Sequence, residues 1–107
     1  MASYSSMRHR VRADRVGTIG AWSISQDVDK DNKTYYHLYH YATRMVSWYR
    51  NEDGTAEVFY TNIGHGSVSD QQGVNAALYE LNAPMRYARN GGYARYEEIK
   101  KEEYETV

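Results

Sequence analysis

No cysteine occurs among the 107 residues, and proline and phenylalanine occur once each. Without thiols the chain forms neither disulfides nor thiolate metal sites, which fits a reducing compartment. No apolar run approaches the roughly 20 residues of a membrane-spanning helix. The first six residues also have no apolar segment of the kind found in secretory signals. We therefore expect a cytoplasmic protein that does not associate with a membrane.

An excess of charge of one sign is absent as well. The chain has 13 Lys and Arg against 14 Asp and Glu, a net charge of −1. No overall field then favours nucleic acid or an anionic membrane. The length suits one domain, so we expect a single domain over residues 1–107, with a loose N-terminus (1–6) and an acidic tail or short helix (97–107).

Tyrosine is the abundant residue, with 12 copies beside two tryptophans. Its ring is apolar and its tip polar, which suits half-buried sheet faces and contact surfaces. Twelve copies are more than one small core should hide. We therefore expect some of them to be exposed.

Alternation at period two predicts strands along the first part of the chain. Residues 7–15 are expected to form a strand with three arginines on one face: Arg8, Arg10 and Arg12. Residues 16–24 continue the alternation, and the glycines there suggest a bulge. The polar run 26–33 is then a loop.

A second β segment covers residues 34–49 and should bend near Ala42 and Thr43. Within it, Tyr35, His37 and Tyr39 are expected on one face and the residues between them on the other. Residues 51–54 predict a turn, with Gly54 where positive φ is needed, and residues 56–61 return as a strand.

One amphipathic helix is expected to begin at Ser69, where Ser69 and Gln72 form a capping box. Its apolar stripe has helical spacing: Val74, Ala77, Leu78 and Leu81. Pro84 ends it. Residues 85–96 are ambiguous between a last edge strand and a turn at 90–92. These elements predict an α+β fold, a small antiparallel sheet of 3–5 strands packed by one helix.

Histidines and serines supply the candidate chemistry. His37 and His40 lie three residues apart, which puts them on opposite faces of a strand, so we expect no shared metal. His65, Ser67, Ser69 and Asp70 include the residue types of a hydrolytic triad, but triad members come together through tertiary folding. We therefore expect no catalytic residue, no metal and no cofactor.

Two binding sites remain as candidates. The loop before the helix could cradle an anion on its amides and hydroxyls through Gly64, His65, Gly66, Ser67 and Ser69; simple helix capping is the alternative. The arginines of residues 8–15, with nearby tyrosines, could contact phosphates and stack on bases; an edge strand protected by charge is the alternative. Exposed tyrosine beside arginine is also typical of protein-binding surfaces. The candidate contacts to protein or nucleic acid are Arg8, Arg10, Arg12, Tyr35, Tyr39 and Arg44.

Two motifs resemble a known group. At residues 40–45 (His-Tyr-Ala-Thr-Arg-Met) and 64–75 (Gly-His-Gly-Ser-Val-Ser-Asp-Gln-Gln-Gly-Val-Asn), the chain resembles small proteins of bacteriophages, especially actinobacteriophages, which form a domain-of-unknown-function family. The family has no assigned activity, cofactor or catalytic residue. The resemblance implies a phage accessory protein acting inside the infected bacterium.

The leading hypothesis is a non-catalytic accessory protein that binds, and inhibits or redirects, a host or phage protein. Nucleic-acid binding through the N-terminal arginines and anion or nucleotide binding at loop 64–69 are the alternatives. The sequence leaves the oligomeric state and the partner open.

Overall fold

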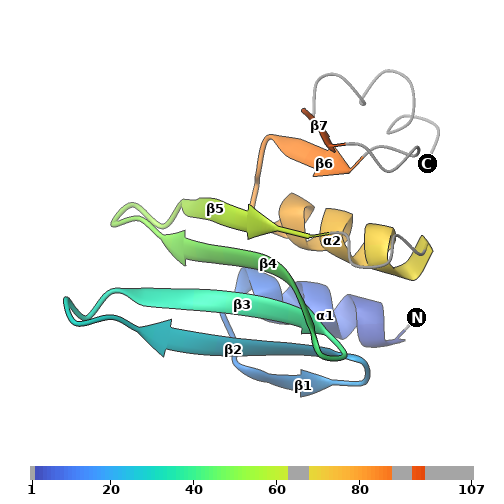
Figure 1. Ribbon diagram of the computed structural model, residues 1–107, viewed down its shortest axis with the longest axis horizontal. Coiled ribbons are helices and arrows are strands. Elements are labelled where there is room, and N and C mark those ends of the chain that lie inside the picture. The colour runs from blue at the N-terminus through green and yellow to red at the C-terminus, as the bar shows by residue number, and fades with distance from the viewer. Residues whose placement is uncertain (1, 63–67, 88–92, 96–107) are drawn as a thin grey trace.

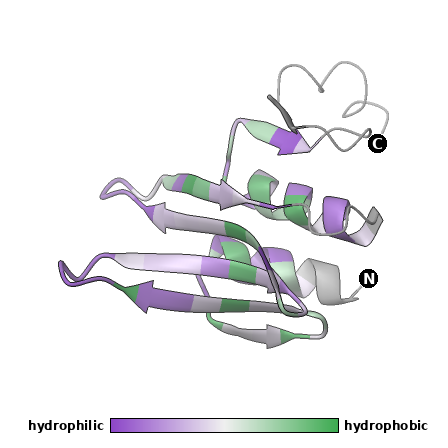
Figure 2. Cartoon of the chain, in the orientation of Figure 1, coloured by the Kyte–Doolittle hydropathy of each residue, from purple (hydrophilic) through white to green (hydrophobic). Residues whose placement is uncertain are grey.

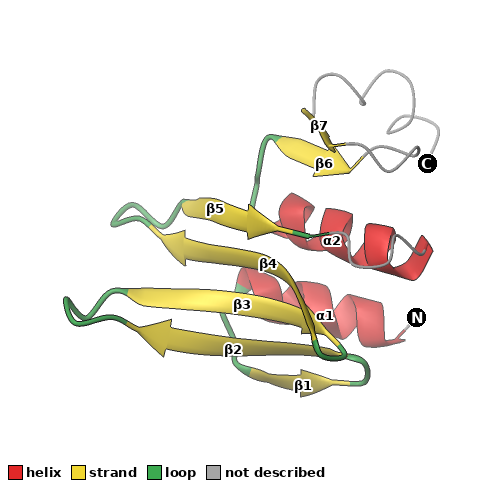
Figure 3. Ribbon diagram, viewed as in Figure 1, coloured by secondary structure: helices red, strands yellow, loops and turns green. Residues whose placement is uncertain are grey.

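A computed structural model describes residues 2–62, 68–87 and 93–95 (Figure 1). In chain order the elements are α1 (Ala2–Arg12), β1 (Gly17–Ile19), β2 (Trp22–Val28), β3 (Thr34–His40), β4 (Thr43–Arg50), β5 (Ala56–Thr61), α2 (Val68–Glu80), β6 (Met85–Tyr87) and β7 (Tyr93–Arg95). Strands β1 to β5 form one antiparallel sheet in sequence order. Both helices lie behind this sheet (Figure 3). The expected α+β class is confirmed.

Helix α1 replaces the strand predicted over 7–15 and the loose terminus predicted before it. Met7 and Val11 are four residues apart, so they share a helix face, and both are buried in the core. Arg8 and Arg12 have the same spacing, and both contact Glu80 of α2. The alternating arginines are compatible with either structure. The helix prevails because it covers apolar sheet surface that α2 alone leaves open.

The two long β segments each divide into two strands. Residues 16–24 contain β1, a turn and the start of β2, with Gly20 at φ 58° in the turn. Residues 34–49 divide between β3 and β4, with Tyr41 at φ 57° in the turn. Strand β2 continues to Val28, which shortens the expected loop. Turning back lets each segment satisfy its backbone groups by antiparallel pairing.

The predicted hairpin between β4 and β5 is confirmed. The N–H of Asn51 donates to the carbonyl of Thr55 at 2.7 Å, and Gly54 has φ 90°. Arg50 pairs with Ala56 at the first position of the ladder. The turn therefore has glycine where the positive φ occurs.

The apolar stripe predicted for the second helix is buried: Val74, Ala77 and Leu78 lie in α2, and Leu81 directly follows it. The helix begins at Val68, one residue earlier than expected, so Ser69 lies inside the first turn and not at the cap. Asn82, at φ 57°, follows the helix before Pro84. The helix is therefore positioned by its apolar spacing.

Residues 85–96 contain strands β6 and β7, which pair with each other and not with the large sheet. Asn75 of α2 holds this hairpin, since its side chain accepts from the N–H of Tyr87 at 2.8 Å and donates to the carbonyl at 3.0 Å. The turn predicted at 90–92 and the tail 97–107 lie outside the described residues.

The core lies between the helices and the sheet. Its sheet side consists of Trp22, Ile24, Leu38, Met45, Val46 and Trp48. A register shift between β3 and β4 makes room for the consecutive Met45 and Val46, which are both fully buried. Along the strands, apolar positions form isolated green bands (Figure 2), as one-sided burial requires.

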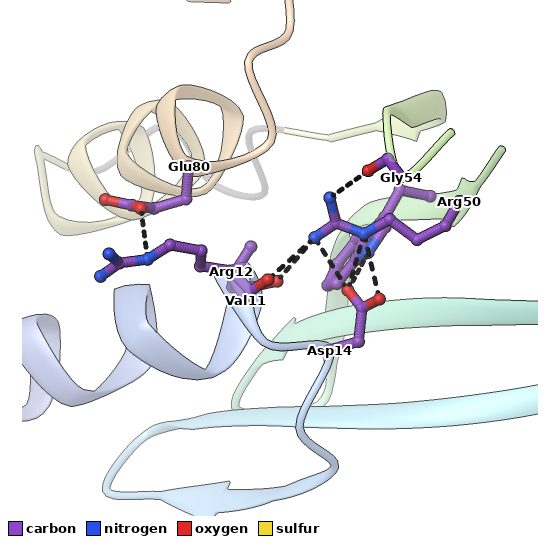
Figure 4. Close-up of polar contacts among 7 residues, drawn as sticks. Val11, Arg12, Asp14, Arg50, Gly54 and Glu80 are labelled. Atoms are coloured by element: carbon purple, nitrogen blue, oxygen red, sulfur yellow. Dashed lines mark hydrogen bonds and ion pairs between the residues drawn. The ribbon is translucent and has the colours of Figure 1, made fainter. Parts of the chain in front are cut away.

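Arg50 connects the end of α1 to the β4–β5 turn (Figure 4). Its guanidinium donates to the Asp14 carboxylate at 3.0 to 3.1 Å and to the carbonyls of Val11, Arg12 and Gly54 at 3.2 to 3.3 Å. A cation that binds the last carbonyls of a helix satisfies groups that have no partner within the helix. Arg50 therefore fixes where α1 ends.

Within residues 2–62, 68–87 and 93–95, no helix is long and apolar enough to cross a membrane.

Candidate functional site

The face of the sheet opposite the helices is called the outer face here. Strand alternation, cross-strand register and, for Phe59, its ring contact with Tyr35 place on it residues that include Asp27, Tyr35, His37, Tyr39, Arg44, Ser47, Tyr49, Glu57, Phe59 and Tyr60. No described element covers this face, because both helices lie on the other side (Figure 1). Among the described elements, none blocks contacts with this side of the sheet.

An aromatic cluster occupies the outer face of β3, β4 and β5. The ring of Tyr35 meets Phe59 at 5.6 Å and Tyr49 at 5.9 Å, both edge to face, and Tyr49 lies 6.1 Å from Phe59. These separations are favourable for aromatic pairs. Phe59 nevertheless remains 51% exposed. The cluster therefore presents a large apolar ring to solvent in a fixed arrangement.

Two cations lie over tyrosine rings on the same face. Lys33 Nζ is 3.6 Å from the centroid of Tyr49 and 5.8 Å from that of Tyr35. The Arg44 guanidinium is 4.2 Å from the centroid of Tyr60. Such contacts stabilise by about 0.5–1 kcal/mol when exposed. They place positive charge at the borders of the aromatic cluster.

Three of the predicted contact residues share this face. Tyr39 pairs directly with Arg44 across β3 and β4, and Tyr35 belongs to the aromatic cluster. Phe59, Tyr49 and Lys33 also belong to this surface and were not predicted from the sequence. Alternation in β4 and β5 predicts the face of Tyr49, but a register shift after Ser47 re-aims the residues of β5.

A chain of polar contacts, buried at His37 and Ser47 and exposed at Asp27, lies beside the aromatic cluster. His37 Nδ1 is 2.7 Å from Ser47 Oγ, and His37 Nε2 is 2.9 Å from Asp27 Oδ2. These are the residue types of a serine hydrolase triad. Ser47, however, has 0% exposure in the middle of β4, and the adjacent backbone belongs to the sheet ladder. A substrate therefore reaches neither the hydroxyl nor free amides beside it. The contacts instead join the three strands β2, β3 and β4.

His40 has a different environment on the inner side. Its Nδ1 lies 2.6 Å from Asp70 Oδ1 on α2, and its ring stacks on Trp22 at 4.0 Å. The two histidines therefore point to opposite faces, as expected. Asp70 is buried in this contact, so it ties α2 to the sheet. The described residues contain no group of three or more His, Asp and Glu side chains arranged to hold a metal ion.

The N-terminal arginines do not line one face of a strand, contrary to the prediction. Arg8 and Arg12 bind opposite oxygens of Glu80 at 2.9 and 3.2 Å, and Arg10 donates to the carbonyl of Val16 at 3.3 Å. They lie on the helix side of the molecule, away from Tyr35, Tyr39 and Arg44. Helical spacing separates these side chains because successive positions turn around the axis.

Of the candidate anion loop, only Ser69 lies within the described residues. Gly64, His65, Gly66 and Ser67 lie outside the described residues, whereas Ser69 lies in the first turn of α2 with its side chain exposed.

Comparison of the chain with protein-family models, with curated proteins and with solved structures gives no match.

Proposed function

We propose that this chain is a non-catalytic binding protein that docks another protein on the outer face of its sheet. One observation carries the proposal, namely the cluster of Tyr35, Tyr49 and Phe59 on a face that no described element covers, with Phe59 half exposed. Aromatic anchors contribute much of the binding energy at protein interfaces. Because these rings already contact one another, docking costs little side-chain entropy.

The charges around the cluster favour a protein over a polyanion. Lys33 and Arg44 lie over tyrosine rings, while Asp27 and Glu57 lie on the same face. The four charges cancel, whereas binding to phosphates needs an excess of positive charge. The partner expected from this balance presents an apolar patch bordered by charges of both signs.

The polar chain of His37, Ser47 and Asp27 supports a non-catalytic role. The Ser47 hydroxyl is inaccessible and is bound by His37, which in turn is bound by Asp27. The polar groups in the middle of the sheet therefore have hydrogen-bond partners. In the setting implied by the phage resemblance, the partner is a host or phage protein whose action is inhibited or redirected.

Affinity capture with a matched pair of variants tests the proposal. Phe59→Ser removes the exposed ring of the cluster. Val28→Ser removes a similarly exposed apolar side chain, 54% accessible, at the end of β2. Tagged wild-type protein and both variants are incubated with nuclease-treated bacterial lysate, and the captured protein is then purified and titrated by calorimetry. We expect Phe59→Ser to weaken its affinity roughly 30-fold, as for a hot-spot residue, and Val28→Ser to leave it unchanged.

Two results contradict the proposal. Equal affinity of Phe59→Ser and wild type, with both folded by circular dichroism, places the binding surface elsewhere. Reversible dimerisation that Phe59→Ser abolishes, measured by sedimentation, shows that the face binds a second copy of this chain instead.

A further inference from the structure

A basic cleft lies on the helix side, between the C-terminal half of α1 and the start of the sheet. It has a volume of about 470 Å³ and is lined by Ser6, His9, Arg10, Arg12, Arg15 and Ile19. Three of these residues are arginines, and this lining includes no carboxylate. It is separate from the outer face, so what it binds does not depend on the function proposed above.

Arg10 is held in place in the cleft without losing its charge. Its Nη1 donates to the carbonyl of Val16 at 3.3 Å, which is a neutral acceptor. Gly17 permits this close approach, because a Cβ there would lie 2.4 Å from the same nitrogen. The guanidinium is therefore positioned before any ligand arrives, which lowers the entropy cost of binding.

The neighbouring carboxylates do not neutralise the cluster. Glu80 is shared by Arg8 and Arg12, so these three side chains together keep one excess positive charge. Asp14 is bound by Arg50 and by the indole N–H of Trp48, each at 3.0 Å.

Arg15 is exposed and forms no ion pair within the part of the chain that the structure describes. Basic residues in the last turn of α1 also interact favourably with the negative end of the helix dipole. That explanation does not extend to Arg15, which lies beyond the helix.

We infer that this cleft binds the phosphate backbone of nucleic acid. Guanidinium groups match phosphate oxygens in geometry and retain their charge at all relevant pH values. A duplex presents a phosphate charge about every 1.7 Å along its axis, so several arginines on one surface are satisfied together. The lining contains one ring, the imidazole of His9, and no amide side chain to read adenine. We therefore expect phosphate contacts to supply most of the affinity.

Fluorescence anisotropy with a labelled DNA duplex of arbitrary sequence tests the inference. The full chain is titrated at several salt concentrations as wild type, Arg15→Gln, Arg12→Gln and, as matched control, Arg44→Gln on the outer face. We expect Arg15→Gln to weaken binding roughly tenfold and to reduce the slope of log affinity against log salt by about 1. Arg12→Gln should act in the same direction, and Arg44→Gln should leave affinity and slope unchanged.

Three results overturn the inference. The first is that the wild type shows no measurable binding at low salt. The second is that Arg15→Gln and Arg44→Gln lose equal affinity, because such a loss reflects net charge and not a defined site. The third is binding of a polyglutamate peptide as tightly as DNA with the same sensitivity to Arg15→Gln, which assigns the cleft to acidic proteins. Thermal unfolding of Arg15→Gln checks that the fold is intact.

Discussion

Replacing Gly73 by alanine should destabilise this protein, although the same change stabilises most helices. Gly73 lies inside α2, where glycine is normally about 0.5–1 kcal/mol less stable than alanine. Here an added Cβ would lie 2.0 Å from Cη2 and 2.2 Å from Cζ2 of Trp22. Ordinary carbon contacts are about 3.5–4.0 Å, so either the indole or the helix must move by an ångström or more.

The surroundings of Trp22 prevent an easy shift. The ring is 4% exposed and stacks on His40 at an interplanar angle of 13°, and His40 is bound to Asp70 on the same helix as Gly73. Moving the indole therefore disturbs the contact that attaches α2 to β3. Overpacking of this kind costs about 1–3 kcal/mol or more. After the gain in helix propensity, we expect a net loss of roughly 2 kcal/mol.

Chemical denaturation of a double-mutant cycle measures this effect. Gly73→Ala, Trp22→Phe and the double variant are compared with Gln72→Ala, an exposed neighbour for which we expect a change within about 0.5 kcal/mol. Trp22→Phe removes the distal ring atoms and destabilises by creating a cavity. In that background, Gly73→Ala should become neutral or stabilising. If Gly73→Ala raises the denaturation midpoint in the wild-type background, the reasoning is refuted.

Three further changes test other parts of the structure. Leu78→Ala, at a fully buried position of α2, should lower the free energy of unfolding by about 2–5 kcal/mol in urea denaturation, and an unchanged midpoint would show that the helix is misplaced. Arg50→Lys keeps the charge but loses the planar fork that binds Asp14, so we expect a loss of roughly 1–3 kcal/mol, and thermal unfolding equal to wild type would contradict this role. The hydrogen bond that Tyr35 donates to Asp29 raises the pKa of the phenol above its usual value near 10, so the stabilisation is present below pH 10 and is lost as the pH rises through the folded pKa. Asp29→Ala should therefore lower the pKa of Tyr35, as followed by the NMR shift of its ring carbon, and an unmoved titration would exclude the bond.

The same hydrogen bond acts on Asp29 in the opposite direction. The N–H of Lys33 first, and then the Tyr35 hydroxyl and the N–H of Asp31, lower the pKa of its carboxyl. Any stability from this loop is present above the unfolded pKa and is lost as the pH falls through the folded one.

Short-range patterns were enough to predict parts of this molecule. The stripe from Val74 to Leu81 and the hairpin turn at Gly54 follow from helix period and from backbone sterics, which depend on neighbouring residues only. Alternation likewise assigned Tyr35 and Tyr39 to one face, because a strand has a period of two wherever it lies.

The rest depended on contacts between residues distant in the chain. Residues 7–15 carry both a period-two and a helical pattern. Only the apolar sheet surface left open by α2, together with Glu80, selects the helix. Likewise, the pairing of His40 with Asp70 joins residues 30 apart in sequence. The basic cleft has the same origin, since the Arg10 side chain lies against Gly17 and the N–H of Arg15 donates to the carbonyl of Arg10. Local propensity is weak compared with burial of an apolar face, so the three-dimensional packing decided these features.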